Sequence, residues 1–152
     1  VNFHLYGNKN IIYEKKIIKL KNVYFKGYFE YSKLVLIMNN YKILLMPYKK
    51  NVGVLIKNIN VAKYFSPLKM FDYLASGKII IASNLSVYKN ILINKVNSIV
   101  INDDVNQWSK MITKVLNTSK YNYLGKTARI DSKKFSWKSR IIKIIEFQNK
   151  WF

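Results

Sequence analysis

Short apolar runs that read as strands alternate along this chain with longer amphipathic runs that read as helices. The expected strands cover 2–7, 22–27, 41–48, 78–83 and 97–102. The expected helices cover 11–20, 31–40, 67–76, 87–92, 103–117, 119–131 and 136–150. Such alternation is typical of an α/β domain. We therefore predict a parallel sheet flanked by helices, with a helical C-terminus.

The length of 152 residues suits a single domain with one hydrophobic core. The chain has no cysteine, which excludes disulfides and thiolate metal sites. It also has no uninterrupted apolar run of about 18 residues, so we expect no membrane span. The chain begins without Met, in what reads as a strand already under way. We therefore expect one domain cut from a longer protein.

The net charge of +20 favours an anionic partner such as a nucleic acid, an acidic lipid or a phosphate. Of the 27 basic residues, however, only Arg129 and Arg140 are arginines. Specific nucleic-acid readers favour arginine for its bidentate geometry. The chain is also rich in Asn, Ile and Tyr, as A/T-rich codons would produce. Most lysines are then solvated surface charge, and no specific nucleic-acid partner is expected.

Ligands of open parallel sheets bind beyond the carboxyl ends of the strands. In this sequence the expected strand ends place Gly7, Lys26-Gly27-Tyr28, Tyr48 and Ser83 at that edge. Glycine permits a backbone to approach a ligand closely, although it also serves in ordinary turns. These residues are therefore candidate cleft-lining positions.

The segment "YFSPLKMFDYLASGKIIIAS", 64–83, contains the start of a helix with an unusual charge. Ser66 is a good N-cap and Pro67 a good first helical residue, so the amides of Leu68 and Lys69 should point out of the helix start. A lysine there opposes the helix dipole unless an anion binds. Asp72 follows at i+3 from Lys69. The pair is either part of a phosphate and sugar site or an ordinary surface ion pair.

The segment "SPLKMFDYLASGKIIIASNL", 66–85, resembles the nucleotide-sugar-binding motif of GT-B glycosyltransferases of group 1, also called glycosyltransferase family 4. Weaker resemblances follow in the same order along the chain: "FHLYGN", "NVYFKGYF", "YKILLMPY", "NSIVINDDVNQW" and "FSWKSRIIKI". The resemblance implies a Rossmann-like, donor-binding C-terminal half of a GT-B enzyme. It also implies a missing N-terminal acceptor domain, a cytoplasmic location and a role in bacterial envelope polysaccharide or glycan synthesis.

The resemblance implies that the chain binds a UDP- or GDP-type sugar. It also implies retaining transfer without a metal or other cofactor. Ser66, Pro67, Leu68 and Lys69 would hold the diphosphate, and Asp72 the ribose. Lys26, Gly27 and Tyr28 would border the base. Gly7, Tyr48, Tyr64 and Ser83 would line the cleft. No catalytic residue is assigned, and the isolated chain is expected not to turn over.

The sequence departs from the family pattern at four positions. Two glutamates separated by seven residues are common in the family, but this chain has Tyr64 and Asp72 there. Asn84 and Asn90 stand where an aspartate and a glutamate are usual. Because aspartate is one methylene shorter than glutamate, the ribose contact of Asp72 would be weaker or pass through water.

Other functions remain open from the residues alone. Lysines and tyrosines could bind RNA or single-stranded DNA, but they are spread along the chain rather than clustered. The Lys/Trp-rich C-terminal end could contact the anionic inner face of the plasma membrane. A sugar-nucleotide epimerase would share the architecture but lacks the Ser-Pro-Leu-Lys pattern. His4, the single histidine, and the seven carboxylates do not suggest a metal site.

The last expected helix, 136–150, carries an apolar stripe at spacings of three and four residues. The stripe contains Trp137, Ile141, Ile144, Ile145, Gln148 and Trp151. We expect it to pack against the sheet of this domain. The alternative is that its end docks on a missing partner domain.

Overall fold

The computed structural model describes residues 1–7, 19–49 and 68–150. Most of the helix expected over 11–20, and nearly all of the connection expected over 49–65, lie outside this part of the chain. The chain divides into two compact units, Val1–Ile37 and Met38–Phe152.

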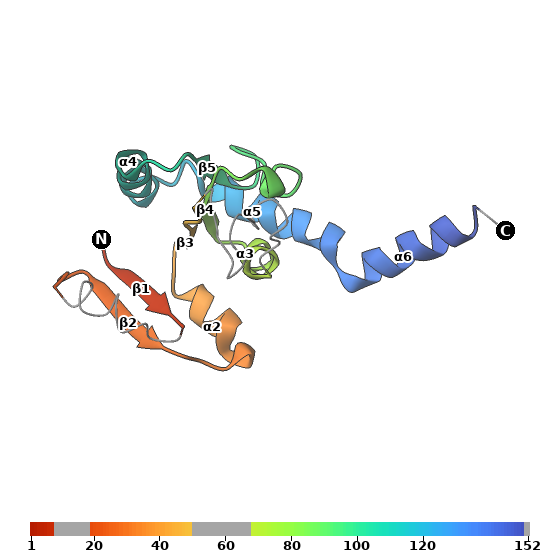
Figure 1. The fold of residues 1–152 in the computed structure, drawn as a ribbon, viewed down its shortest axis with the longest axis horizontal. Coiled ribbons are helices and arrows are strands. Elements are labelled where there is room, and N and C mark those ends of the chain that lie inside the picture. The colour runs from red at the N-terminus through yellow and green to blue at the C-terminus, as the bar shows by residue number, and fades with distance from the viewer. Residues whose placement is uncertain (8–18, 50–67, 151–152) are drawn as a thin grey trace, which may run out of the picture. The chain divides into compact units, whose positions relative to one another are not determined.

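Unit 1 contains a pair of parallel strands, β1 (Phe3–Tyr6) and β2 (Val23–Gly27), drawn in red and orange in Figure 1. The pairing shifts by one residue between Leu5 and Tyr6. A short 3₁₀ turn, η1 (Tyr31–Lys33), then leads into α2 (Leu34–Asn39), within which unit 1 ends. None of the described residues of unit 1 is buried.

Unit 2 contains a parallel sheet in the order β3 (Ile43–Met46), β4 (Ile79–Ser83), β5 (Ile99–Ile101). All five residues of the central strand β4 are buried. A central parallel strand has neighbours on both sides and helices on both faces, which is why it reads as a continuous apolar run. The prediction of an α/β fold with parallel strands and flanking helices is confirmed.

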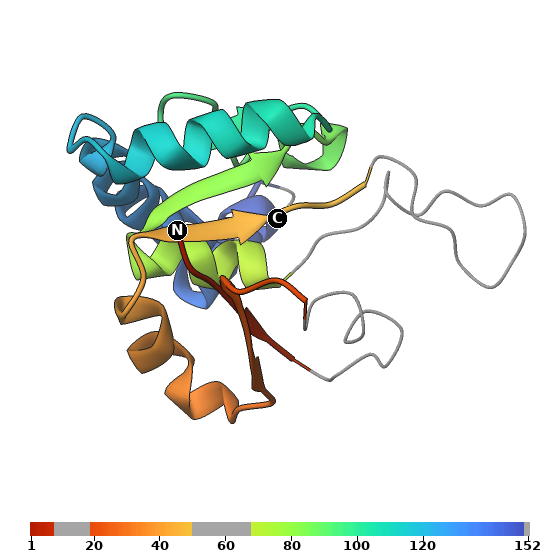
Figure 2. The ribbon, with the colours of Figure 1, turned by 90° about the vertical axis from the view of Figure 1, so that its left-hand side faces the viewer.

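Helices cover both faces of this sheet. As Figures 1 and 2 show, α4 (Val105–Leu116) lies on one side, and α3 (Lys69–Ser76) and α5 (Asn122–Ser132) lie on the other. The side chain of Asp104 caps α4 by accepting hydrogen bonds from two backbone amides, a role that aspartate commonly has at helix starts. The main core cluster consists of Met46, Met70, Leu74, Ile80, Ala82, Leu85, Tyr88, Leu92 and Ala128.

Two glycines let α3 and α5 approach closely. Gly77 ends α3 in the left-handed conformation, with φ of 70°, as a C-terminal glycine should. A Cβ atom placed on Gly125 of α5 would lie 2.1 Å from the Gly77 carbonyl oxygen. Only glycine therefore fits at position 125 without a shift of the backbone.

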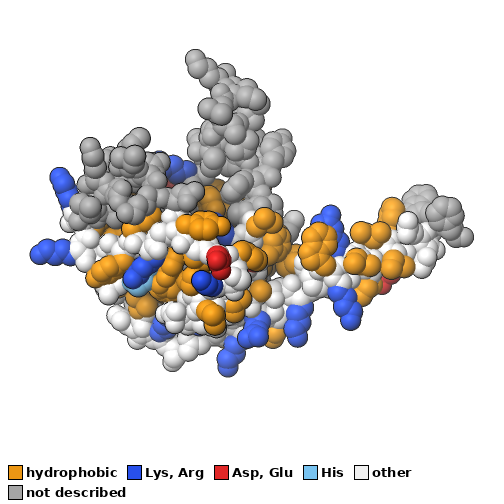
Figure 3. Space-filling view, turned by 90° about the horizontal axis from the view of Figure 1, so that it is seen from below, with side chains coloured by type: hydrophobic (Ala, Val, Ile, Leu, Met, Phe, Trp, Pro, Cys, Tyr) orange, Lys and Arg blue, Asp and Glu red, His pale blue; other side chains and the backbone are white. Residues whose placement is uncertain are grey.

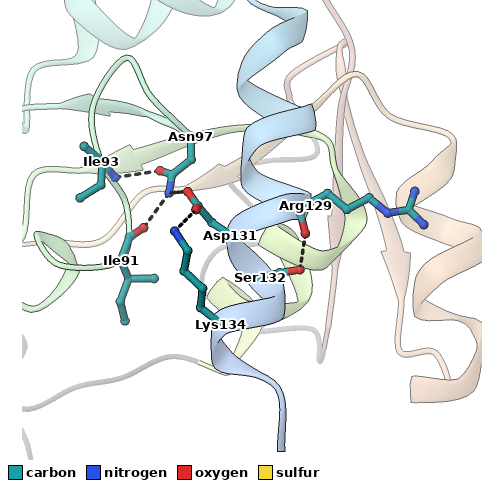
Figure 4. Close-up of polar contacts among 7 residues, drawn as sticks. All are labelled: Ile91, Ile93, Asn97, Arg129, Asp131, Ser132 and Lys134. Carbon is teal, nitrogen blue, oxygen red and sulfur yellow. Dashed lines mark hydrogen bonds and ion pairs between the residues drawn. The ribbon is translucent and has the colours of Figure 1, made fainter. Parts of the chain in front are cut away.

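The prediction of a helix over 87–92 is wrong, because the structure has only a 3₁₀ turn there, η3 (Ser86–Tyr88). The side chain of Asn97 bonds to the backbone at the end of this segment, as Figure 4 shows. Its Oδ1 accepts from the Ile93 amide at 2.8 Å, and its Nδ2 donates to the Ile91 carbonyl at 2.9 Å. The same Nδ2 donates to Asp131 of α5 at 2.9 Å. This side-chain network holds the 91–97 segment in a non-helical conformation.

The C-terminal helix α6 (Trp137–Gln148) contradicts the expectation that its stripe packs on the sheet of this domain. A 3₁₀ turn, η4 (Lys133–Phe135), and the extended residue Ser136 separate it from α5. Not one residue of α6 is buried. Figure 3 shows its hydrophobic side chains at the surface with basic ones beside them. In the described residues, no helix is long and apolar enough to cross a membrane.

Candidate functional site at the carboxyl ends of β3 and β4

The carboxyl ends of β3 and β4 are joined by a hydrogen bond. Pro47 and Tyr48 follow β3, and the Tyr48 amide donates to the Ser83 Oγ at 2.8 Å. Ser83 is the last residue of β4 and is buried. Because the hydroxyl of Ser83 accepts a backbone hydrogen bond, it holds the chain after β3 against the end of β4. Two of the expected cleft-lining residues, Tyr48 and Ser83, are thus in contact, and their role in a cleft stays a prediction.

Lys69, the first residue of α3, lies beside this edge. Its Nζ is 5.2 Å from the centroid of the Tyr48 ring. A cation within about 6 Å of an aromatic face is attracted by the ring. Since Lys69 is exposed, its ammonium also remains open to solvent. The structure thus brings three sequence-predicted residues together: Lys69, Tyr48 and Ser83.

The described part of α3 begins at its N-terminal end with Leu68 and Lys69. Leu68 occupies the N-cap position in a helical conformation, with no side-chain hydrogen bond to cap the helix. Ser66 and Pro67, the expected cap and first helical residue, lie outside the described residues, as does Tyr64. Asp72 lies in the first turn of α3 and is half-buried. Its predicted contact with ribose stays a prediction.

Two further tyrosines surround Tyr48 and were missed by the sequence analysis. The rings of Tyr48 and Tyr88 meet edge to face, with centroids 6.5 Å apart. Tyr88 is buried, and its hydroxyl has no hydrogen-bond partner among the described residues. Burial, with a smaller contribution from Tyr48, raises the pKa of Tyr88 to about 12. The spacing of Leu85, Tyr88 and Leu92 could have indicated a buried tyrosine, but not its neighbour.

Tyr73 of α3 belongs to the same group. Burial raises the pKa of its hydroxyl, while the positive charge of Lys69 acts in the opposite direction. Tyr48 and Asp72 also act on Tyr73 electrostatically. Among the described residues, two tyrosines, Tyr48 and Tyr73, therefore lie near the charge of Lys69.

Asn84, one of the departures from the family pattern, pairs with another amide side chain. Its Nδ2 donates to the Oδ1 of Asn102 at 3.0 Å, which connects the residues after β4 and β5. Asn90, the other departure after β4, is exposed.

The candidate base-binding residues Lys26, Gly27 and Tyr28, with Gly7, belong to unit 1. Gly27 adopts a φ of 73° at the end of β2, and its carbonyl accepts from the Gly7 amide at 3.0 Å. The Nζ of Lys26 lies 5.8 Å from the centroid of the Tyr24 ring. Tyr28 is 78% exposed. Gly7 and Lys26-Gly27-Tyr28 follow or end the strands β1 and β2 of unit 1, whereas Lys69 and Tyr48 belong to unit 2.

The described residues contain no set of side chains that could bind a metal ion. No group of three or more histidine, aspartate or glutamate side chains comes together there.

Comparison with known proteins gives a fold likeness. No protein-family model and no curated protein matches the sequence. Three similar solved structures are sucrose-phosphate synthase from Thermosynechococcus elongatus, TarM, and HepE from Anabaena in complex with UDP and glucose. Their TM-scores are 0.70, 0.69 and 0.68, and their sequence identities are 17%, 19% and 13%.

The matches cover 98%, 96% and 98% of this chain, but only 38%, 28% and 40% of those proteins in the same order. This chain therefore spans well under half the length of the structures it resembles. All three structures are GT-B glycosyltransferases. The likeness confirms the predicted architecture, and the chain has the α/β fold of part of a GT-B glycosyltransferase.

Proposed function

We propose that this chain is the donor-binding part of a GT-B glycosyltransferase similar to family 4, and that it binds a nucleotide-diphosphate sugar. The observation that carries the proposal is the position of Lys69. Its ammonium lies in the first turn of α3, beside the carboxyl ends of β3 and β4. This edge is where open parallel sheets bind ligands. The motif around Lys69 is the part of the sequence that most resembles the family.

In this proposal Lys69 and the backbone amides at the start of α3 neutralise the diphosphate. Amides at a helix start and a lysine side chain can balance two phosphate charges. Transfer then proceeds without a metal, and with retention. Asp72 accepts a hydrogen bond from ribose, and Lys26, Gly27 and Tyr28 border a uracil or guanine base. The acceptor is bound by a domain that this chain does not contain.

We propose that the protein acts in bacterial envelope polysaccharide or glycan synthesis, in the cytoplasm. The protein could also bind peripherally to the anionic inner face of the plasma membrane. Because the acceptor domain is absent from this chain, we expect the 152-residue chain to bind donor without transferring sugar. Sugar transfer by this chain alone would contradict that expectation.

The test is an amide NMR titration of the chain with UDP and with GDP, up to millimolar concentrations. We expect one nucleotide to shift the amides of Leu68, Lys69 and Asp72, equally with magnesium and with a chelator. Lys69→Met should weaken binding about tenfold or more, since it removes a charged hydrogen bond.

The matched control is Lys110→Met on α4, which removes the same charge from the opposite side of the sheet. It should leave the affinity unchanged. Equal losses in both variants, or small shifts spread over many lysines, would mean that nucleotide binds to general surface charge. The proposed donor site would then be wrong.

A further inference from the structure

Tyr48 contacts both parts of the candidate site, through its backbone and through its ring. Its amide donates to the buried Ser83 Oγ at 2.8 Å. The Lys69 Nζ lies 5.2 Å from the centroid of the Tyr48 ring. The same ring meets the ring of the buried Tyr88 edge to face. Lys69 and Ser83 belong to different elements, and Tyr48 connects them.

The Tyr48 ring is better fixed than the lysine beside it. Tyr48 is half-buried and packs against the main core cluster, which includes Tyr88. The hydrogen bond to Ser83 restrains its backbone as well. Lys69 is exposed, and a lysine in water can adopt many rotamers. A fixed aromatic face beside a flexible cation restricts where that cation resides.

We propose that Tyr48 is a positioning residue that holds the Lys69 ammonium at the carboxyl ends of β3 and β4, where it meets an anionic group of the donor. This inference rests on the proposed function. An ammonium group has three N–H donors, so the side turned away from the ring can still bind a phosphate oxygen. Because Lys69 is already placed, less side-chain entropy is lost when the anion binds.

The contact itself is tested by NMR on the ligand-free chain. Protons above an aromatic ring resonate upfield, so the Cε protons of Lys69 should be shifted upfield and should show an NOE to the Tyr48 ring. Tyr48→Phe keeps the ring and should keep the shift. Tyr48→Leu should abolish it. Absence of both signals in the wild-type chain would overturn the inference even if Tyr48→Leu fails to fold.

The effect on binding is tested by a double-mutant cycle with UDP and with inorganic pyrophosphate as probes. We expect Tyr48→Leu to weaken both about two- to fivefold, the range of an exposed cation–π contact. Tyr48→Phe should bind as the wild type does. In a Lys69→Met background, Tyr48→Leu should have no further effect, because the residue it positions is gone. A purely structural role of Tyr48 would instead lower the affinity in both backgrounds.

Trp137→Leu is the matched control, because α6 contains a similar contact. There the Arg140 guanidinium carbon lies 5.6 Å from the centroid of the Trp137 ring. The substitution removes this contact outside the site and should leave the affinity for both probes unchanged. Nucleotide binding without coupling between Tyr48 and Lys69 would overturn this inference alone. If neither probe binds the wild-type chain, the proposed function and this inference both fall.

Discussion

The two units of this chain contain the same kind of parallel strand pairing but differ in how they are packed. In unit 2, the central strand β4 and parts of α3 and α5 are fully buried. In unit 1, β1 and β2 pair in parallel, yet none of the described residues is buried. Strand pairing alone contributes little stability without apolar burial. We therefore expect the stability of the described structure to reside in unit 2, and substitutions in the two units to differ sharply.

The largest difference is expected between two leucine truncations. Leu74 of α3 is 0% exposed and Leu5 of β1 is 38% exposed. Leu74→Ala should lower the free energy of unfolding by about 2–5 kcal/mol, because it leaves a cavity in a packed core. Leu5→Ala should lower it by about 1 kcal/mol or less. Urea unfolding followed by circular dichroism measures both, and equal losses would contradict the contrast between the units.

A second substitution tests the close packing of α3 against α5 in unit 2. Gly125→Ala should lower the free energy of unfolding by about 1–3 kcal/mol, since the new Cβ would collide with the Gly77 carbonyl. Helix propensity alone would favour alanine by up to about 1 kcal/mol, so the sign of the change tests the contact. Thermal unfolding of the variant gives that sign. A more stable variant would mean that the two helices are not packed this closely.

The network around Asp131 should make the stability of unit 2 depend on pH. Hydrogen bonds from Lys134, and then from Asn97, hold the pKa of Asp131 below its usual value. The ionised carboxylate therefore contributes its full stability above about pH 4, and this contribution is lost as the pH falls through the lowered pKa. Asp131→Ala should lower the free energy of unfolding at pH 7 by about 1–3 kcal/mol, because an N–H of the buried Asn97 loses its acceptor.

Urea unfolding of the wild type and of Asp131→Ala at pH 7 and near pH 3 measures this dependence. The difference between the two proteins should narrow in acid. A constant difference between the wild type and Asp131→Ala across this pH range would show that the charge of Asp131 is not involved.

The smallest effect is expected at Tyr88, the buried tyrosine next to Tyr48. Its hydroxyl has no partner among the described residues, so Tyr88→Phe should leave the free energy of unfolding unchanged or raise it by up to about 1 kcal/mol. The raised pKa adds a second signature. Stability from Tyr88 is present below pH 10.0 and is lost as the pH rises towards about 12. The phenylalanine variant should lose less stability over this alkaline range, and a large loss at neutral pH would show that the hydroxyl has a partner.

Much of the framework was predictable because it depends on local patterns. The five strands were expected within a few residues of their observed bounds, and the helices expected over 67–76 and 103–117 end and begin beside Gly77 and Asp104 as observed. The helix expected over 87–92 was wrong: the segment forms a 3₁₀ turn, and its end is bonded to the side chain of Asn97, which periodicity does not reveal. The stripe of α6 was visible in the sequence, but periodicity does not say which surface a stripe covers.

The sequence by itself determined the α/β class, the approximate order of the elements and the position of Lys69 near a helix start. These follow from apolar periodicity and from the conformational preferences of Gly, Pro and Asp, which act over a few residues. Tertiary structure alone decided that Lys69 lies over Tyr48, that the Tyr48 amide bonds to Ser83, and that Tyr88 is buried beside them. Those contacts join residues from different elements, so they exist only once the sheet and its helices have packed together.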